Sequence, residues 1–408
     1  MRNEIRQTLW WLRHAKNIMK KGKKGMAERK IIYWIEGDGI GPEIWRAARP
    51  VIDRAAKSAG IEFDWRELLA GEKAVQKTGS PLPDETLETL KGADLAMKGP
   101  LGTPVGTGIR SLNVALRKGL DLYACIRPVS HIPGLETPVK HPELVNMVIF
   151  RENTEDVYAG IEFSAKSAEA EKLGSFLRNE LNCAALPPDA AIGIKPMTEK
   201  GSKRLIRRAI KYALERKLPS VTLMHKGNIM KFTEGAFRQW GHDVARDEFG
   251  DLTCTEKERV PGRLVIKDRI ADAMFQEALL HPAEYSVIAT PNLDGDYISD
   301  ALAAQVGGLG VAPGVNMSDT LAFFEATHGT APTIAGQDRA NPSSLVLCGA
   351  MLLEHIGQPE AAQSIRAALQ AAIDAKTVTG DLAAQVEGAK IVSCSEFGKI
   401  LAAYPALQ

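Results

Sequence analysis

The stretch IIYWIEGDGIGPEI occupies residues 31–44 and indicates the fold class of the chain. Its first five residues are β-branched or aromatic and precede a glycine-rich turn, which is typical of a buried strand. The segment that follows repeats apolar residues at helical spacing as far as Gly60. These residues are Ile44, Ala47, Ala48, Val51, Ile52, Ala55 and Ala56. A strand that leads directly into an amphipathic helix predicts an α/β protein.

The glycines of this turn, Gly37, Gly39 and Gly41, invite comparison with the dinucleotide-binding fingerprint. In the G-x-G-x-x-G pattern the third glycine would fall at position 42, which is Pro42. We therefore reject a Rossmann domain and predict a tight connection between strand and helix.

The same alternation continues along the chain. We predict further strands at Met147–Phe150, Val221–His225, Leu264–Ile266 and Ser286–Thr290. We predict helices at Lys203–Lys217, Arg269–Leu280, Tyr297–Val306 and Ser364–Ala372. Strands that alternate with helices predict an α/β architecture with a largely parallel sheet.

Composition narrows the class of protein. The 408 residues are 45% hydrophobic and carry a formal net charge of +1, so no overall basic field favours nucleic acid. No apolar stretch reaches the roughly 18–20 residues of a membrane helix. The five cysteines form no C-x-x-C pair, which indicates reduced thiols and a cytoplasmic enzyme with no membrane partner.

The N-terminal 30 residues differ from the rest of the chain. They contain ten lysines and arginines against Glu4 and Glu28. The segment is interpreted as a basic tail, residues 1–28, that is expected to be disordered, or as upstream sequence with Met26 as the natural start. An organelle presequence is the third alternative.

Three arginines follow or interrupt apolar runs. Arg117 closes a segment that also holds Ser111 and Asn113, and Arg127 and Arg151 come next. Guanidinium groups bind carboxylates in a bidentate manner. Taken singly, each arginine is as well explained by a surface salt bridge, so the hypothesis of an anion site depends on their convergence.

Aspartates occur in two pairs with a spacing of four residues, Asp268 with Asp272 and Asp296 with Asp300. On a helix, residues four apart share one face. Two such pairs are expected to offer oxygen ligands to Mg²⁺ or Mn²⁺, although an ordinary polar helix face is the alternative for each pair.

Two further residues are candidates for proton transfer. Lys226 directly follows the predicted strand Val221–His225, and Tyr158 lies in the segment EDVYAG. A lysine beside a metal and other cations can exchange protons near neutral pH.

Together these segments resemble the isocitrate dehydrogenases of the bacterial homodimeric type, in the isocitrate/isopropylmalate (β-decarboxylating) dehydrogenase family. The resemblance runs from about Ile31 to the C-terminus. Its most specific stretches are Gly108–Arg117, Val139–Gly160, His225–Gly235, Asp296–Gly308 and Phe324–Pro332.

The resemblance implies a role for each matching residue. The implied catalytic residues are Tyr158, Lys226, Asp272 and Asp296. The implied isocitrate-binding residues are Ser111, Asn113, Arg117, Arg127 and Arg151. The implied ligands of Mg²⁺ or Mn²⁺ are Asp272, Asp296 and Asp300. The implied reaction is the oxidative decarboxylation of isocitrate to 2-oxoglutarate and CO₂, a step of the tricarboxylic acid cycle.

The resemblance also implies an organisation of the chain. We expect a large domain from residues 29–122 and 307–408, a small domain from residues 123–155 and 201–306, and a clasp from residues 156–200. Lys226 and Asp272 act in the neighbouring subunit's site in this family, so a homodimer with shared active sites is expected.

Ser111 and Asn113 bear on the substrate. They stand where relatives that oxidise 3-isopropylmalate need an apolar pocket. A hydroxyl and an amide suit a third carboxylate and would be left unpaired against an isopropyl group. The expected substrate is therefore isocitrate.

The implied cofactor-binding residues are Leu101, Thr103, Gly310, His328, Gly329, Thr330, Ala331, Thr333, Ile334, Asn341 and Asp381. In the family's NADP-dependent members a lysine, two tyrosines and an arginine grip the 2′-phosphate. Here these positions hold Thr333, Ile334, Gly380 and Ala384, and a phosphate normally recruits cations. We therefore expect an NAD-dependent isocitrate dehydrogenase, although Arg339 nearby offers a substitute cation.

Other hypotheses remain. An NADP-dependent isocitrate dehydrogenase and an enzyme of the homoisocitrate or isopropylmalate type belong to the same class. A protein that binds nucleic acid through its basic tail belongs to another, and the near-neutral remainder of the chain argues against it.

Overall fold

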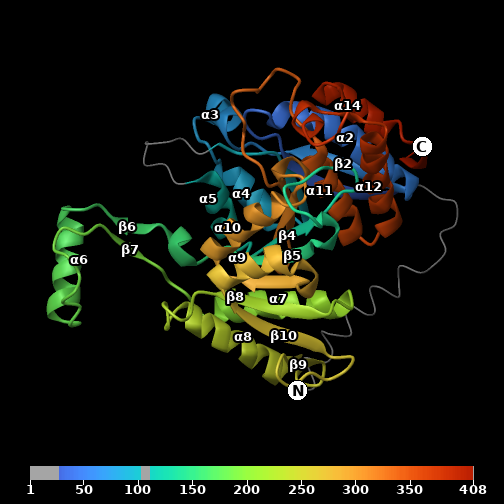
Figure 1. Ribbon diagram of the computed structural model, residues 1–408. Coiled ribbons are helices and arrows are strands. Elements are labelled where there is room, and N and C mark those ends of the chain that lie inside the picture. Colours follow the sequence, from blue (N-terminus) through green and yellow to red (C-terminus); the bar gives the residue numbers. More distant parts are fainter. Residues whose placement is uncertain (1–26, 103–110, 408) are drawn as a thin grey trace.

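The computed structural model describes residues 27–102 and 111–407. The basic tail as far as residue 26 and the expected cofactor residue Thr103 lie outside these ranges. The α/β fold predicted from the sequence is confirmed, with one large mixed sheet at its centre (Figure 1). In order across the sheet the strands are β2 (Ile61–Glu67), β1 (Glu28–Ile35), β3 (Leu95–Lys98), β13 (Ala322–Ala326), β12 (Pro313–Met317), β4 (Ala124–Ser130), β5 (Asn146–Glu152), β11 (Val287–Thr290), β8 (Ser220–His225), β10 (Leu264–Ile270) and β9 (Thr253–Thr255).

The sheet is parallel at both ends and antiparallel in its middle. Strand β12 runs antiparallel to both β13 and β4, and β4 runs antiparallel to β5. All other neighbours in the sheet are parallel. The antiparallel centre brings β4 and β5, which carry Arg127 and Arg151, side by side.

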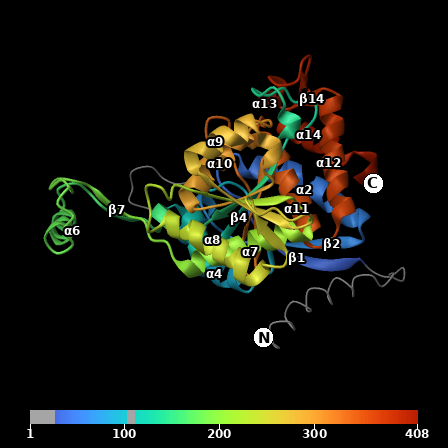
Figure 2. The same ribbon diagram turned by 60° about the horizontal axis from the view of Figure 1, so that its bottom comes forward.

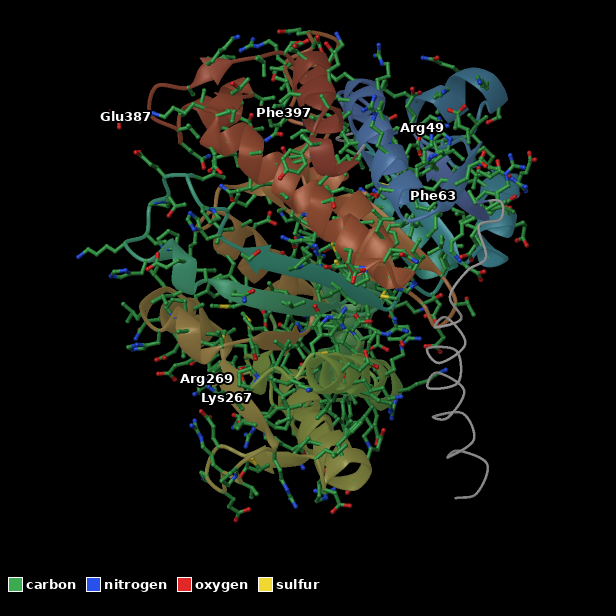
Figure 3. All side chains as sticks on the ribbon, turned by 90° about the vertical axis from the view of Figure 1, so that its right-hand side faces the viewer. Arg49, Phe63, Lys267, Arg269, Glu387 and Phe397 are labelled. Carbon is green, nitrogen blue, oxygen red and sulfur yellow. The ribbon has the colours of Figure 1, made fainter. Side chains whose placement is uncertain are left out.

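Helices cover the sheet. They are α2 (Gly41–Ser58), α3 (Glu72–Thr78), α4 (Asp84–Lys91), α5 (Leu112–Gly119), α7 (Glu199–Glu215), α8 (Glu234–Phe249), α9 (Ala271–Leu280), α10 (Asn292–Ala303), α11 (Ser343–His355), α12 (Pro359–Asp374), α13 (Gly380–Ala383) and α14 (Cys394–Ala402). Helices α2, α11, α12 and α14 gather at one end of the molecule (Figure 2). Figure 3 shows Phe397 of α14 among these helices, where its side chain is fully buried. No helix among the described residues has the length and apolar character needed to cross a bilayer.

The glycine-rich turn after β1 is filled by the protein's own backbone. A Cβ on Gly37 would lie 2.4 Å from the carbonyl oxygen of Pro100, and one on Gly39 would lie 2.2 Å from that of Thr330. Both glycines have positive φ. The Ile40 amide donates to the same Thr330 carbonyl over 3.0 Å. The turn therefore joins β1 tightly to α2 and supports the loop that contains Thr330.

An arm projects from the body (Figure 1, left). It consists of the antiparallel strands β6 (Ile161–Phe163) and β7 (Ile192–Ile194) with helix α6 (Ala168–Asn179) between them. Phe176, Leu181, Ile161 and Ile194 are exposed on it, and Phe176 retains 51% of its accessible surface. An apolar surface of this kind is typical of a segment that packs against another chain.

The predicted strands coincide with β5, β8, β10 and β11, and the predicted helices overlap α7, α9, α10 and α12. One prediction was wrong: Asp268 and Asp272 do not share a helix face. Strand β10 continues through Asp268 to Ile270, because the segment pairs with β8 along its length. Only Asp272 belongs to α9.

Candidate active site

Three arginines from separate segments converge beside helix α10. Arg117 comes from α5, Arg127 from β4 and Arg151 from β5. The side chain of Arg151 is 1% exposed and that of Arg127 is 9% exposed. Burial, together with the charges of Arg117 and Arg127, lowers the pKa of Arg151. The convergence on which the hypothesis of an anion site depended is therefore present.

The two aspartates of α10 neutralise part of this positive charge. Arg151 Nη1 pairs with Asp296 Oδ1, and Arg127 Nη1 lies 3.3 Å from Asp300 Oδ1. Burial alone would raise the pKa of Asp296, but Arg151 and Tyr158 outweigh it and hold that pKa below its ordinary value. Asp296 and Asp300 lie one helical turn apart, as their spacing predicted.

Tyr158 completes this group from η2, a 3-10 helix that spans Asp156–Ala159. Its hydroxyl donates to Asp296 Oδ2 over 2.6 Å, and the Arg151 guanidinium lies 4.9 Å from its ring centroid. Burial and the hydrogen bond to Asp296 raise the pKa of Tyr158 to about 12. The hydroxyl therefore stays protonated near neutral pH and is available as a proton donor.

Helix α5 presents polar atoms that lack a partner. Asn113 Oδ1 and Arg117 Nε are buried without a hydrogen bond to any described residue. Ser111 precedes the helix, and its hydroxyl makes no capping hydrogen bond there. Buried polar atoms are rarely left unpaired, so this face of α5 is suited to a polar ligand.

Sequence reasoning missed a buried ion-pair group behind Arg117. Glu325 on β13 is 4% exposed; its carboxylate lies 2.8 Å from Arg117 Nη2 and 2.6 Å from Lys98 Nζ on the neighbouring strand β3. Burial opposes ionisation of Glu325, but Lys98 and Arg117 outweigh it and hold its pKa well below the usual range. Lys98 and Arg117 lie more than 200 residues before Glu325 in the sequence, so no local sequence pattern connects them with it.

We expect Glu325→Gln to lower the free energy of unfolding by about 3–5 kcal/mol, because it leaves two buried cations uncompensated. The melting temperature measured by circular dichroism reports this loss. The depressed pKa means that the stabilisation is present above the ordinary glutamate pKa of about 4.3 and is lost as the pH falls below it. Asp319→Asn is the control, because Asp319 is 87% exposed in its pair with Arg208 and should contribute at most about 1 kcal/mol. Equal losses in the two variants would contradict this prediction.

Lys226 and Asp272 lie apart from the arginines. They form an ion pair with each other, and 71% of the Asp272 side chain is exposed. The Lys226 ammonium lowers the pKa of Asp272. Within the described residues no three histidine, cysteine or acidic side chains meet as a metal site, so Asp272 does not join Asp296 and Asp300 in the same chain. Asp268, the partner predicted for Asp272, instead lies between His225, His242 and Arg238.

Seven of the eleven predicted cofactor residues fall into two groups. His328, Gly329, Thr330 and Ala331 follow β13, and His328 Nε2 is buried with no partner among the described residues. In the second group, Asn341 Nδ2 donates to Asp381 Oδ2 over 3.0 Å, and a Cβ on Gly310 would meet the same oxygen. Leu101 is buried, whereas Thr333 is exposed and Ile334 half-buried. An unpaired imidazole nitrogen and a carboxylate beside backbone that only glycine permits suit a nucleotide with hydroxyl groups.

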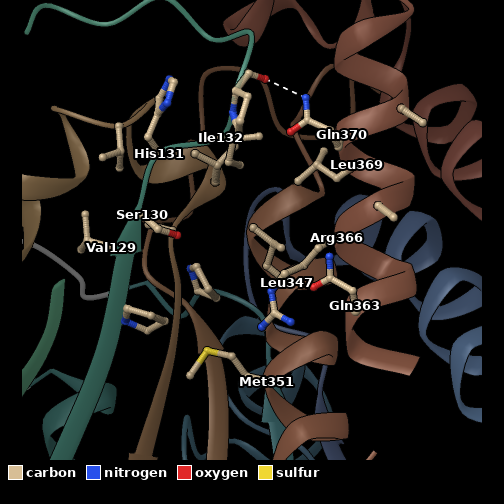
Figure 4. A pocket seen from close by; sticks show the side chains of 18 of the residues that line it. Val129, Ser130, His131, Ile132, Leu347, Met351, Gln363, Arg366, Leu369 and Gln370 are labelled. Atoms are coloured by element: carbon tan, nitrogen blue, oxygen red, sulfur yellow. Dashed lines mark hydrogen bonds between the residues drawn. The ribbon is translucent and has the colours of Figure 1, made fainter. Parts of the chain in front are cut away.

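A separate cavity of about 500 Å³ lies between the end of β4 and helices α11 and α12. Figure 4 shows Ser130, His131 and Ile132 on one side and Gln363 and Arg366 on the other. None of the predicted site residues lines it.

The profile of the family described as isocitrate/isopropylmalate dehydrogenase matches residues 31–401. The chain belongs to this family. An isocitrate dehydrogenase [NADP] of Coxiella burnetii is 54% identical to this chain, and the match covers 95% of this chain and 94% of the relative. An isocitrate dehydrogenase [NADP] of Staphylococcus epidermidis is 52% identical, and the match covers 90% of this chain and 93% of the relative. The crystal structure of isocitrate dehydrogenase from Methylococcus capsulatus superposes with a TM-score of 0.77 at 39% identity, covering 93% of this chain and 99% of that one.

The family relatives correct the predicted cofactor. Both curated relatives are named as NADP-dependent, so the prediction of an NAD-dependent enzyme was wrong. The prediction rested on four lost side chains at Thr333, Ile334, Gly380 and Ala384, and a lost ligand does not exclude a different one. Arg339 lies exposed six residues after Thr333, with its guanidinium 3.4 Å from Gln337 Oε1. Arginine is a side chain that pairs readily with phosphate.

Proposed function

We propose that the chain is an NADP-dependent isocitrate dehydrogenase that forms 2-oxoglutarate and CO₂ with a divalent metal ion. The observation that carries the proposal is the convergence of Arg117, Arg127 and Arg151 beside Asp296. Each guanidinium has one carboxylate partner, Glu325, Asp300 or Asp296. Lys98 adds a fourth cation, and Asn113 Oδ1 and Arg117 Nε have no hydrogen-bond partner among the described residues. A divalent metal ion held by Asp296 and Asp300 would occupy two of these carboxylates, and the group would then carry the positive charge that a small tricarboxylate needs.

The proposed roles of the chain's residues follow from their positions. The three arginines, with Ser111 and Asn113, bind and orient isocitrate. Lys226 accepts the proton of the substrate hydroxyl. Tyr158, whose hydroxyl donates to Asp296 Oδ2 beside the arginines, gives a proton to the carbon from which CO₂ has left. His328, Asn341 and Asp381 would hold NADP, which would supply the hydride acceptor. Asp296 and Asp300 would hold the metal ion, which would supply positive charge beside the substrate oxygen.

The donor set fits Mg²⁺ or Mn²⁺ in its chemistry. Asp296 and Asp300 offer carboxylate oxygens one helical turn apart, and more than half of the Asp300 side chain is exposed. We propose that Asp272 of a second subunit supplies a third carboxylate. The pair Lys226–Asp272, which lies apart from the arginines in its own chain, would then serve the partner's site.

A homodimer with shared active sites is therefore part of the proposal. The exposed apolar residues of the arm, among them Phe176 and Leu181, support it, because a second arm would cover them. The order of the sheet supports the proposed division of the body. Strands from residues 29–122 and 307–408 occupy one end, and strands from residues 123–155 and 201–306 occupy the other.

Steady-state assays with isocitrate and 3-isopropylmalate, with NADP and NAD, and with Mg²⁺ and Mn²⁺, test this function. We expect the largest kcat/KM for isocitrate with NADP, exceeding that with NAD by at least about tenfold, or ~1.4 kcal/mol. Arg339→Gln should reduce this ratio if its guanidinium meets the phosphate. Faster turnover of 3-isopropylmalate would contradict the substrate, and a preference for NAD would contradict the cofactor.

A further inference from the structure

Four charged residues form a cluster where the arm joins the body, next to segments that carry the proposed catalytic residues. We call Asp156, Lys195, Glu234 and Asp294 the basal cluster. Lys195 Nζ lies 2.8 Å from Asp156 Oδ1 and 2.5 Å from Glu234 Oε1. Asp156 is 1% exposed and Glu234 is fully buried. Asp294 lies close enough to interact electrostatically with the other three.

One cation in this cluster faces three carboxylates. The side chain of Lys195 is only 14% exposed. Removing the cation partner of a buried carboxylate strongly destabilises the folded protein. Lys195 therefore determines whether Asp156 and Glu234 can remain together in the interior.

Two of the three carboxylates, those of Glu234 and Asp156, accept hydrogen bonds from backbone next to proposed catalytic residues. Glu234 Oε2 accepts the backbone N–H of Lys226. Asp156 Oδ1 accepts that of Val157, directly before Tyr158, over 2.6 Å, and Oδ2 accepts that of Leu293, at the start of α10, over 2.9 Å. Asp156 has a φ of +69°, a conformation that non-glycine residues adopt only when their surroundings enforce it.

Lys195 also belongs to the arm, because it directly follows β7. The carbonyl of the next residue, Pro196, accepts the Asp156 amide over 2.9 Å, which ties the two ends of the arm together. The cluster therefore connects the arm with the segments that carry Tyr158, Lys226 and Asp296.

We propose that Lys195 is a positioning residue whose ammonium group, through Asp156 and Glu234, sets the placement of Tyr158 and Lys226. The inference rests on the proposed function. In the proposed dimer Tyr158 acts in the site of its own chain and Lys226 in that of its partner, so a single lysine supports residues of two active sites. It also couples their geometry to the arm, which is the proposed dimer contact.

The test compares Lys195→Met with Lys195→Arg. We expect Lys195→Met to lower kcat for isocitrate about 10- to 100-fold, because misplacement of catalytic groups by about 1 Å has effects of this size. The KM for isocitrate should stay within about threefold, because substrate binding is assigned to the arginines. Lys195→Arg keeps the cation and should retain most of the activity. Lys203→Met is the matched control, since Lys203 forms an ion pair with Glu199 on α7, away from the cluster.

Hydrogen exchange supplies a readout that is independent of turnover. The amides of Val157 and Lys226 should exchange faster in Lys195→Met, and not in Lys203→Met, even if isocitrate proves not to be the substrate. Failure of the proposed function would thus be distinguished from failure of this inference. If Lys195→Met does not fold, Lys195→Met/Asp294→Asn, which also removes an acidic group from the cluster, is measured in its place. Wild-type kcat with unchanged exchange, or a rise in KM alone, would overturn the proposal.

Discussion

Tyr158→Phe is expected to lower kcat for isocitrate about 10²- to 10⁴-fold, the range typical of a lost general acid. The phenol is held by Asp296 Oδ2 at 2.6 Å and lies against the Arg151 guanidinium. Phenylalanine keeps the ring and its contact with Arg151, so the KM for isocitrate should change by less than about threefold. Because the pKa of Tyr158 is raised to about 12, the loss should be the same across neutral pH.

Tyr297→Phe provides the matched control for this variant. Tyr297 follows Asp296 directly on α10, but 59% of its surface is exposed. It should retain wild-type kcat and KM. A Tyr158→Phe enzyme with normal kcat and a raised KM would assign the hydroxyl to substrate binding, contrary to the proposed role in proton transfer.

Local spacing predicted the part of the site that lies on one regular element. Asp296 and Asp300 share a face of α10 as expected, because a helix converts a spacing of four into proximity. The same rule failed for Asp268 and Asp272, because pairing with β8 extends β10 through Asp268. Spacing says which residues would be neighbours on a helix, whereas tertiary pairing decides whether the helix forms.

Ion pairs between residues far apart in the sequence could not be predicted from any local sequence pattern. Glu325 lies opposite Lys98 because β13 pairs with β3 in that register. Lys195 reaches Glu234 because the chain re-enters the body after strand β7 of the arm. Such ion pairs follow from the topology of the sheet, which alternation alone does not fix. The cofactor prediction failed for a related reason. It gave the absence of the four phosphate ligands more weight than Arg339, a cation that can offer charge from another position.

Mixing two inactive variants is expected to restore activity if the active sites are shared between subunits. Tyr158→Phe and Lys226→Met should each be almost inactive as homodimers. In a mixed dimer, one site combines the intact Tyr158 of one chain with the intact Lys226 of the other, and the second site carries both lesions. Random reassociation makes half of the dimers mixed, each with one working site, so the mixture should recover about one quarter of wild-type activity.

The geometry of a single chain is the reason to expect this outcome. Tyr158 is hydrogen-bonded to Asp296 beside the arginines, whereas Lys226 pairs with the largely exposed Asp272 outside that group. If both residues served the site of their own chain, every site in a mixed dimer would carry one lesion and no activity would return. Reassociation after mild denaturation, followed by separation of mixed dimers through a tag on one variant, measures the recovery directly. Mixing Tyr158→Phe with Arg151→Met is the control. Tyr158 and Arg151 belong to the same site within one chain, so each substitution disables the site of its own chain. The mixed dimer then has no intact site, and activity should stay absent.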